Sequence, residues 1–425
     1  MSEQRNSESL LSGYRVLDLT DEKGLLCGKV LGDLGGDVIK VEPPGGDPAR
    51  NIGPFYKDTP HPEKSLFWFY TNLNKRGITL NPETADGRDI FRRLVKTAHF
   101  LIESYEPGYM ARLGLGYPEL EKINPALIMT SITPFGQTGP YAHYQATDMT
   151  LMAMGGLMQI FGDPDRAPVR VSQPQACFFG SIHGAVGSLV AFCHQQSTGE
   201  GQHVDVSCQE AIVLAQYINL EAWDILKYIQ KRQGASMSRV RPAPLGLLLT
   251  KHIYPCQDGF VLGTIMGGAQ AGIVISSRAL TEWANSQGYA LELKDYDWPK
   301  LDLGTALQSE LNVIQDALQA FLLTKTKAEI MDKGVEKAIL LAPTNNAKDL
   351  MESPQLKARE FFVPVRHPEL ADTITYPGFP VKMTGLPYKP QRRAPLIGEH
   401  NEEVYMGELG FTREELARLK ANGVI

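Results

Sequence analysis

Short apolar runs alternate with helical patterns along the N-terminal half of the chain. The runs are rich in Val, Ile and Leu and are bounded by Gly, Pro, Asn or Asp, which is typical of buried β-strands. Between them lie helical segments such as 87–98, with Thr84 and Asp86 near the helix start. We predict strands at 14–19, 37–42, 77–80, 99–104, 126–133 and 203–208. Strands that alternate with helices in this way predict an α/β fold with a parallel sheet.

The pattern changes after about residue 225. The basic, Pro-containing stretch 231–244 is typical of a linker, and two strand-like runs with several helices follow it. These elements predict a smaller inserted α/β domain. The chain ends in a helix with Thr412 as its N-cap and Gly423 as its stop. We expect a large domain over 1–225, a linker and small domain over 226–375, a return to the large domain over 376–425, and a disordered lead-in over 1–13.

Composition excludes several classes of function. The chain has 42 Lys plus Arg and 48 Asp plus Glu, a net charge of −6, so we expect no nucleic-acid partner. No apolar run reaches the roughly 18 residues of a membrane span, so we expect no membrane partner. The five cysteines are odd in number and form no CxxC pair, which favours reduced thiols in the cytoplasm and no metal site. No GxGxxG follows the first strand, so we expect no nicotinamide or flavin.

Six segments, in order along the chain, resemble the class III CoA-transferase family, the formyl-CoA and carnitine transferase group. They are VLDLT with GLLCGKVLGDLGGDVIKVEPPGGDPAR (16–50), NLNKRGITL (72–80), ESYEPGYMARLGLGYPEL (103–120), SITPFGQTGPY (131–141), TGEGQHVDVSCQEA (198–211) and PLIGEHNEEV (395–404). The resemblance implies a Rossmann-like large domain, a smaller inserted domain, and two chains interlocked as a dimer. It also implies coenzyme A or acyl-CoA as substrate.

In this family an aspartate attacks the acyl-CoA thioester and forms a mixed anhydride, which must be shielded from water. The matching segment here is VRVSQPQACFFGSIHGAVG, in which Gly180 matches a glycine four residues after the nucleophile. The nucleophile position therefore falls on Ala176, or on Cys177 if the alignment slips by one residue. No Asp or Glu occurs from 166 to 199. The acidic residue of the family's earlier pair matches Asp148.

Several interpretations follow from this missing carboxylate. In the first, the chain is the non-catalytic subunit of a heteromer, with a pseudo-active site, and a homologous partner carries the aspartate. The stretch EPPGGDPARNIGPF resembles subunits of the benzylsuccinate CoA-transferase type, which implies anaerobic aromatic degradation and transfer from succinyl-CoA to an aryl-succinate. In the second, the chain is active alone with Asp148 or Cys177 as substitute nucleophile. A CoA-ester racemase would need acid/base groups at Thr147 and Ala176, which lack them. A non-enzymatic scaffold that binds CoA esters is a further alternative.

The resemblance also implies which residues contact CoA. An aromatic residue beside the cofactor and an arginine for its phosphates are the expected types. The matching residues are Leu80, Ser104, Tyr105, Tyr109 and Arg112. Four departures weaken the match: Pro43 replaces a basic residue, Glu83 replaces a lysine, the loop between Thr20 and Gly24 is one residue short, and RPAPLGLLL (241–249) replaces a glycine-rich loop.

Overall fold

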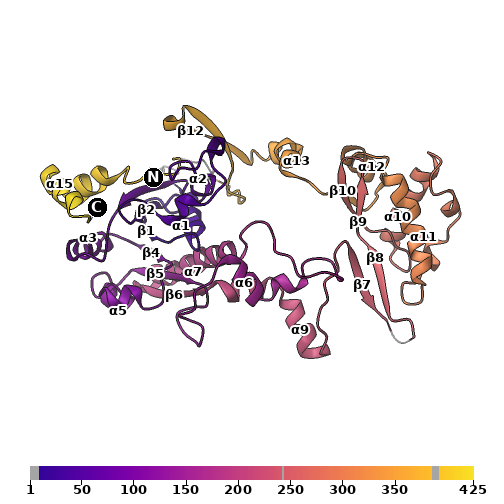
Figure 1. Ribbon diagram of the computed structural model, residues 1–425, viewed down its shortest axis with the longest axis horizontal. Helices are drawn as coiled ribbons and strands as arrows, with labels where there is room; N and C mark the ends of the chain where they lie inside the picture. Colours follow the sequence, from indigo (N-terminus) through magenta and orange to yellow (C-terminus); the bar gives the residue numbers. More distant parts are fainter. Residues whose placement is uncertain (1–8, 242–243, 385–391) are drawn as a thin grey trace, which may run out of the picture. The chain divides into compact units, whose positions relative to one another are not determined.

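The computed structural model describes residues 9–241, 244–384 and 392–425 and divides the chain into two compact units (Figure 1). The first unit takes its described residues from Met1–Met158, Arg170–Ile229 and Gln355–Ile425. The second consists of Gln159–Val169 and the described part of Gln230–Pro354. The N-terminal half and the tail therefore share one unit, as an inserted small domain requires.

A six-stranded sheet with every pairing parallel forms the centre of the first unit. Its strands are β1 (Arg15–Leu19), β2 (Asp37–Glu42), β3 (Lys75–Thr79), β4 (Phe100–Glu103), β5 (Ile128–Thr133) and β6 (Gln202–Ser207). The order β3-β2-β1-β4-β5-β6 is that of a Rossmann-like sheet and confirms the predicted α/β fold. The strand order reverses between β1 and β4, so the edge formed by the strand carboxyl ends is the expected place for a ligand.

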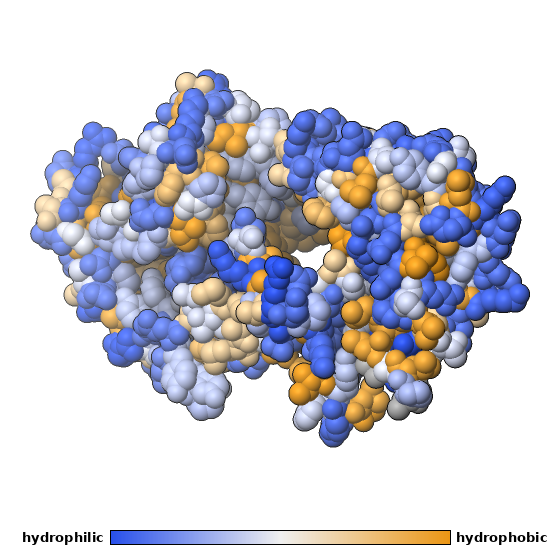
Figure 2. Space-filling view, turned by 45° about the vertical axis from the view of Figure 1, so that its right-hand side comes forward, coloured by the Kyte–Doolittle hydropathy of each residue, from blue (hydrophilic) through white to orange (hydrophobic). Residues whose placement is uncertain are grey.

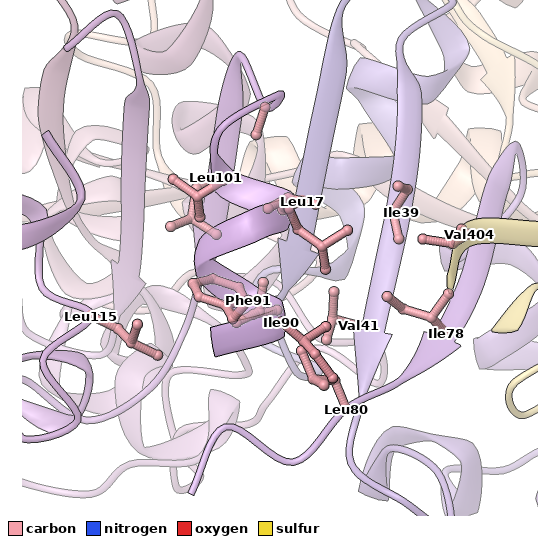
Figure 3. Close-up of a cluster of buried hydrophobic side chains, with 14 of the residues drawn as sticks. Leu17, Ile39, Val41, Ile78, Leu80, Ile90, Phe91, Leu101, Leu115 and Val404 are labelled. Atoms are coloured by element: carbon pink, nitrogen blue, oxygen red, sulfur yellow. The ribbon is translucent and has the colours of Figure 1, made fainter. Parts of the chain in front are cut away.

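The first unit also contains helices, of which α1 and α7 pack directly on the strands of this sheet. They are α1 (Leu25–Asp33), α2 (Leu66–Thr71), α3 (Ala85–Val95), α4 (Tyr109–Arg112), α5 (Tyr117–Glu121), α6 (Asp148–Met154), α7 (Ala176–Thr198), α8 (Cys208–Leu214), α9 (Tyr217–Leu226), α14 (Pro354–Ala358) and α15 (Arg413–Ala421). Figure 3 shows Leu17, Ile39 and Ile78 of the sheet close to Phe91 of α3 and Val404 of the tail. The tail is thus part of the core that holds the strands.

Strand β3 begins two residues before the predicted start, at Lys75. The Lys75 ammonium is fully buried, lies 2.7 Å from the Asp18 carboxylate, and also donates to the Leu25 carbonyl and the Asn72 side chain. The polar sequence Asn-Lys-Arg does not predict a buried strand. Lys75 can be buried only because it pairs with Asp18 of another strand, which the local pattern does not show.

Helix α7 is long and apolar enough to cross a membrane by length and composition alone. Its contacts are those of a core helix, because it packs on β5, β6, α1 and α8. Small residues permit this close packing: a Cβ added at Gly184 would meet the Ile132 side chain at 2.7 Å.

The second unit combines small sheets with helices. Strands β7 (Ser236–Val240) and β8 (Leu247–Lys251) form an antiparallel hairpin, while β9 (Ile253–Cys256), β10 (Gly259–Gly263) and β11 (Leu341–Pro343) form a second sheet. Its helices are α10 (Ala271–Asn285), α11 (Gln308–Leu322), α12 (Lys327–Lys337) and α13 (Ala347–Glu352). The expected linker is thus partly a strand. Segment 241–249, which stands in place of the family's glycine-rich loop, includes residues 242–243, and these lie outside the described residues.

The units differ from the expected domains in three places. Residues 159–169, expected in the large domain, belong to the second unit because the Arg232 guanidinium donates to carbonyls of that segment. The chain returns to the first unit at Gln355 rather than 376, because β12 (Phe362–His367) and β13 (Asp372–Pro377) pack on α2. Part of the expected lead-in is ordered: Leu11 is buried and its N–H donates to the Leu34 carbonyl, while 1–8 lie outside the described residues.

Candidate functional site

A cavity of about 530 Å³ lies at the carboxyl ends of β1–β4, where the strand order predicts a ligand. We call it the sheet-edge cavity. Its walls come from the loops that follow four neighbouring strands, together with one residue of the tail. The lining residues are Leu19, Asp21, Val41, Pro43, Pro44, Asp47, Pro48, Leu80, Asn81, Pro82, Glu83, Ser104, Tyr105, Tyr109 and Gly423. This volume is in the range of cofactor and substrate sites.

The structure brings four of the five expected CoA-contacting residues into this cavity. Leu80, Ser104, Tyr105 and Tyr109 all line it, and the two tyrosine rings lie 4.5 Å apart between centroids. Arg112 does not line the cavity; its guanidinium is exposed and lies over the Tyr109 ring, 5.6 Å from the centroid. The apolar and aromatic residues of the expected site are therefore brought together. Arg112, the residue expected to bind the phosphates, lies outside the cavity lining.

Three carboxylates line the sheet-edge cavity, two of which are neutralised by lysines. The buried Asp47 carboxylate lies 3.1 Å from the Lys40 ammonium. Burial alone would lower the pKa of Lys40, but Asp47, Asp18 and Glu42 raise it above its ordinary value, so the ammonium stays charged. Asp21 forms an ion pair with Lys23.

A second cavity, of about 350 Å³, adjoins the first and shares Asp21, Ser104 and Tyr105 with it. Its other walls are the loops 22–23, 106–107 and 142–146 with Pro134. The Ser181 hydroxyl on α7 donates to the Lys23 carbonyl at 2.9 Å, which ties this loop to the helix. Helix α7 is thereby tied to a wall of the second cavity.

The expected nucleophile position is the first residue of α7. Ala176 is fully buried there, and its methyl group cannot form an anhydride. A carboxylate from α6 contacts the start of α7. Asp148 Oδ1 accepts the backbone N–H of Gln175 at 2.9 Å and that of Cys177 at 3.0 Å. Asp148 therefore caps the positive end of the helix rather than pointing a free carboxylate into the cavities.

Cys177, the other possible nucleophile, is 4% exposed. Burial raises the pKa of its thiol well above the ordinary value, with Cys208 and Asp148 adding to the effect. A thiol attacks only as the thiolate, so this group is unreactive near neutral pH. Neither substitute nucleophile considered from the sequence has the geometry or charge state of one.

Glu103 was missed by the sequence reasoning. It ends β4 beneath Tyr105, and its Oε2 accepts the Tyr105 N–H at 2.7 Å. Burial raises the pKa of the Glu103 carboxyl to about 7. It lines a third cavity of about 150 Å³ with Ser131, Gln137 and His203. The available signal was an acidic residue at the end of the apolar run HFLIES, which a strand prediction alone does not single out.

The chain matches CoA-transferase family III over residues 11–401, and so belongs to this family. It is 33% identical over 422 residues to succinyl-CoA:(R)-benzylsuccinate CoA-transferase subunit BbsE of Thauera aromatica, covering 97% of this chain and 98% of that protein. It is 31% identical over 430 residues to succinyl-CoA–D-citramalate CoA-transferase of Chloroflexus aurantiacus, covering 100% of both. A CAIB/BAIF family protein from Brucella suis superposes with a TM-score of 0.78 at 26% identity, covering 94% of this chain and 99% of that one. The family expected from the six segments is confirmed.

Proposed function

We propose that this chain is the non-catalytic subunit of a heteromeric family III CoA-transferase. The observation that carries the proposal is the first turn of α7. The family's carboxylate position is a buried alanine, Ala176, and the adjacent N–H groups are held by Asp148. A relative of similar length is itself named a subunit, which supports an assembly of two related chains.

In the proposed reaction, the partner supplies the aspartate. Its carboxylate attacks the thioester carbonyl, the C–S bond breaks, and the CoA thiolate leaves with the bonding electrons while a mixed anhydride forms. The thiolate then attacks the aspartyl carbonyl and releases the donor acid. The acceptor carboxylate displaces CoA to give a second anhydride, which the thiolate reopens to the product thioester. We propose succinyl-CoA as donor and an aryl-substituted succinate as acceptor, in the cytoplasm.

An apolar helix surface supports the need for a partner. Within α9, all of whose residues the structure describes, none is buried. Ile218, Trp223, Ile225 and Leu226 are each more than half exposed. Figure 2 shows that hydrophobic patches interrupt the largely hydrophilic surface. Exposed apolar groups gathered in this way mark an interface.

On α7, a second row of exposed apolar residues recurs every four positions. Ile182, Val186 and Val190 are 47%, 52% and 66% exposed, and this spacing places them on one face of the helix. A helix of the central sheet thus presents an apolar stripe to its surroundings. We propose that this stripe and α9 are covered by the Asp-bearing subunit, with the two chains interlocked.

The decisive experiment is CoA exchange from succinyl-CoA to a panel of dicarboxylic acids that includes benzylsuccinate. The chain is assayed alone, with the homologous neighbour subunit, and with a neighbour variant whose family aspartate is alanine. We expect turnover only with the unmodified neighbour. Turnover by the chain alone would overturn the proposal in favour of an autonomous enzyme. CoA-ester binding without turnover in any combination would favour a scaffold.

A further inference from the structure

Residues of the tail close the outer edge of the central sheet. Strand β3 is the last strand in the order of this sheet, so half of its N–H and C=O groups point away from the other strands. The His400 N–H donates to the Gly77 carbonyl at 2.9 Å, and the Tyr405 hydroxyl donates to the Thr79 carbonyl at 2.6 Å. The Thr79 N–H donates to the Asn401 side chain at 2.9 Å. We call His400 and Asn401, bound to β3 in this way, the tail latch.

The fourth bond of this edge requires a neutral histidine. The Gly77 N–H donates to His400 Nδ1 at 3.0 Å. A backbone N–H can only donate, so Nδ1 must offer its lone pair and the ring proton must lie on Nε2. A protonated imidazole carries an N–H on both nitrogens and cannot accept this bond. Protonation of His400 therefore breaks the bond and turns two N–H groups toward each other.

The tail packs closely on β3 at this point. Gly77 is buried, and a Cβ added there would meet the Pro395 side chain at 2.8 Å. The Gly77 N–H has no easy access to water while the latch is closed, and a buried donor without an acceptor is costly. Figure 3 shows Val404 of the tail beside Ile78 of β3, and Val404 and Tyr405 are fully buried. Loss of the His400 bond therefore favours opening of the latch, while the buried residues hold the rest of the tail.

The surroundings of His400 favour its neutral form. Burial, the largest influence, lowers the pKa of His400 below its usual 6.5; Glu399 and Glu403 raise this pKa, and Arg392 and Arg76 lower it. Arg76 and Glu399 are themselves held in ion pairs, Arg76 with Asp37, Glu403 and Glu408, and Glu399 with Arg393. The closed latch thus binds fewer protons than the open one. It is favoured at neutral pH and is lost as the pH falls.

We propose that His400 is a pH-sensitive switch: the tail latch is closed on β3 near neutral pH and opens when the imidazole is protonated. Opening frees the outer edge of β3 at Gly77. Residues 80–83 follow β3 directly and form one wall of the sheet-edge cavity. A fall in pH thereby reaches a wall of this cavity through a residue that does not line it. The switch is a property of this chain and does not depend on the proposed function.

The test is hydrogen–deuterium exchange of the purified full chain at pH 7.5 and pH 5.5. Each segment is expressed as a protection factor, so that the pH dependence of unprotected exchange cancels. With a usual histidine pKa of about 6.5 in the open latch, one pH unit below that value favours opening by about tenfold. We therefore expect the protection of 77–79 to fall about fivefold to tenfold. Helix α3, the internal reference, should change by less than about twofold.

Variants of His400 assign this response to the imidazole. His400→Asn places an oxygen acceptor on Cγ, where Nδ1 is attached, and does not titrate in this range, so the fall should disappear. His400→Ala should leave 77–79 weakly protected at both pH values, again without a fall. The matched control is His194→Asn, the same change at an exposed histidine of α7, which should keep the wild-type response.

Two results would overturn the switch. In the first, the protection of 77–79 in the wild type falls no more than that of α3. In the second, either His400 variant keeps the full fall. Both results leave the CoA exchange assay unaffected, so the failure of the switch and the failure of the proposed function are distinguishable.

Discussion

The Asp148 carboxylate accepts the backbone N–H of Cys177 at 3.0 Å, across the 29 residues that separate them in the chain. It accepts the Gln175 N–H as well, so one oxygen closes the first turn on both sides of Ala176. The positive end of a 23-residue helix is thereby satisfied by a carboxylate from a neighbouring helix. A group used in this way stabilises the fold and is not available for attack.

Replacing Asp148 should therefore reduce stability rather than abolish chemistry. We expect Asp148→Ala to lower the free energy of unfolding by about 1–2 kcal/mol, because two helix N–H groups lose their acceptor. Asp148→Asn, which keeps an oxygen acceptor, should cost less. Urea unfolding measures both changes. The heteromer containing either variant should retain its turnover per folded molecule.

A control for this prediction is Asp165→Ala, since Asp165 is an exposed carboxylate that does not cap α7. Its effect on unfolding should be within about 0.5 kcal/mol of zero. A loss of turnover in Asp148→Asn without loss of stability would contradict the capping role and restore Asp148 as a catalytic candidate.

Returning the family's carboxylate to this chain should not restore activity. In Ala176→Asp, a buried carboxylate would be placed between the two N–H groups that already bind Asp148. Two carboxylates at such a short distance raise each other's pKa. We expect a destabilisation of about 2–4 kcal/mol and no turnover by the chain alone. Combining it with Asp148→Asn should recover part of the stability, which a double-mutant cycle in urea would measure. Additive costs would show that the two sites do not interact.

Much of the fold could be predicted because its determinants are local. The apolar runs at 37–42 and 126–133 correspond to β2 and β5, and Thr412 caps α15 as expected. The start of β3 was missed because Lys75 is buried by a partner, Asp18, on another strand. Most of the hairpin of β12 and β13 was expected in the small domain. Its packing partners on α2 lie far away in sequence, so no local pattern shows that it belongs to the first unit.

The candidate site was predictable only as far as single positions match the family. Leu80, Ser104, Tyr105 and Tyr109 were expected from motifs and do meet at one cavity. The role of Asp148 as a cap depends on how α6 and α7 meet, which no local pattern reports. The pairing of Asp47 with Lys40 likewise depends on neighbouring strands and loops.

The buried carboxyl of Glu103 should make stability depend on pH. Its pKa is raised from 4.5 to about 7 by burial, so between these values the folded chain binds more protons than the unfolded chain. Stability contributed by this group is therefore fully present near pH 4.5 and is lost as pH rises through 7. Relative to Glu103→Gln, we expect the wild type to lose about 3 kcal/mol at most between pH 5 and 8. Unfolding curves of both proteins at each pH test this, and parallel pH profiles would contradict it.

The apolar surface of α9 should be needed for assembly and not for the fold of this chain. Ile225 and Leu226 are 76% and 70% exposed, so a polar residue at either position removes no packing within the chain. We expect Ile225→Asp with Leu226→Asp to lower co-purification with the Asp-bearing subunit at least about tenfold, because charged groups would be buried at the interface. The unfolding midpoint of the chain alone should change little. Glu221→Gln, an exposed polar change on the same helix, serves as control and should leave assembly intact. Unchanged co-purification in the double variant would show that the partner does not cover α9.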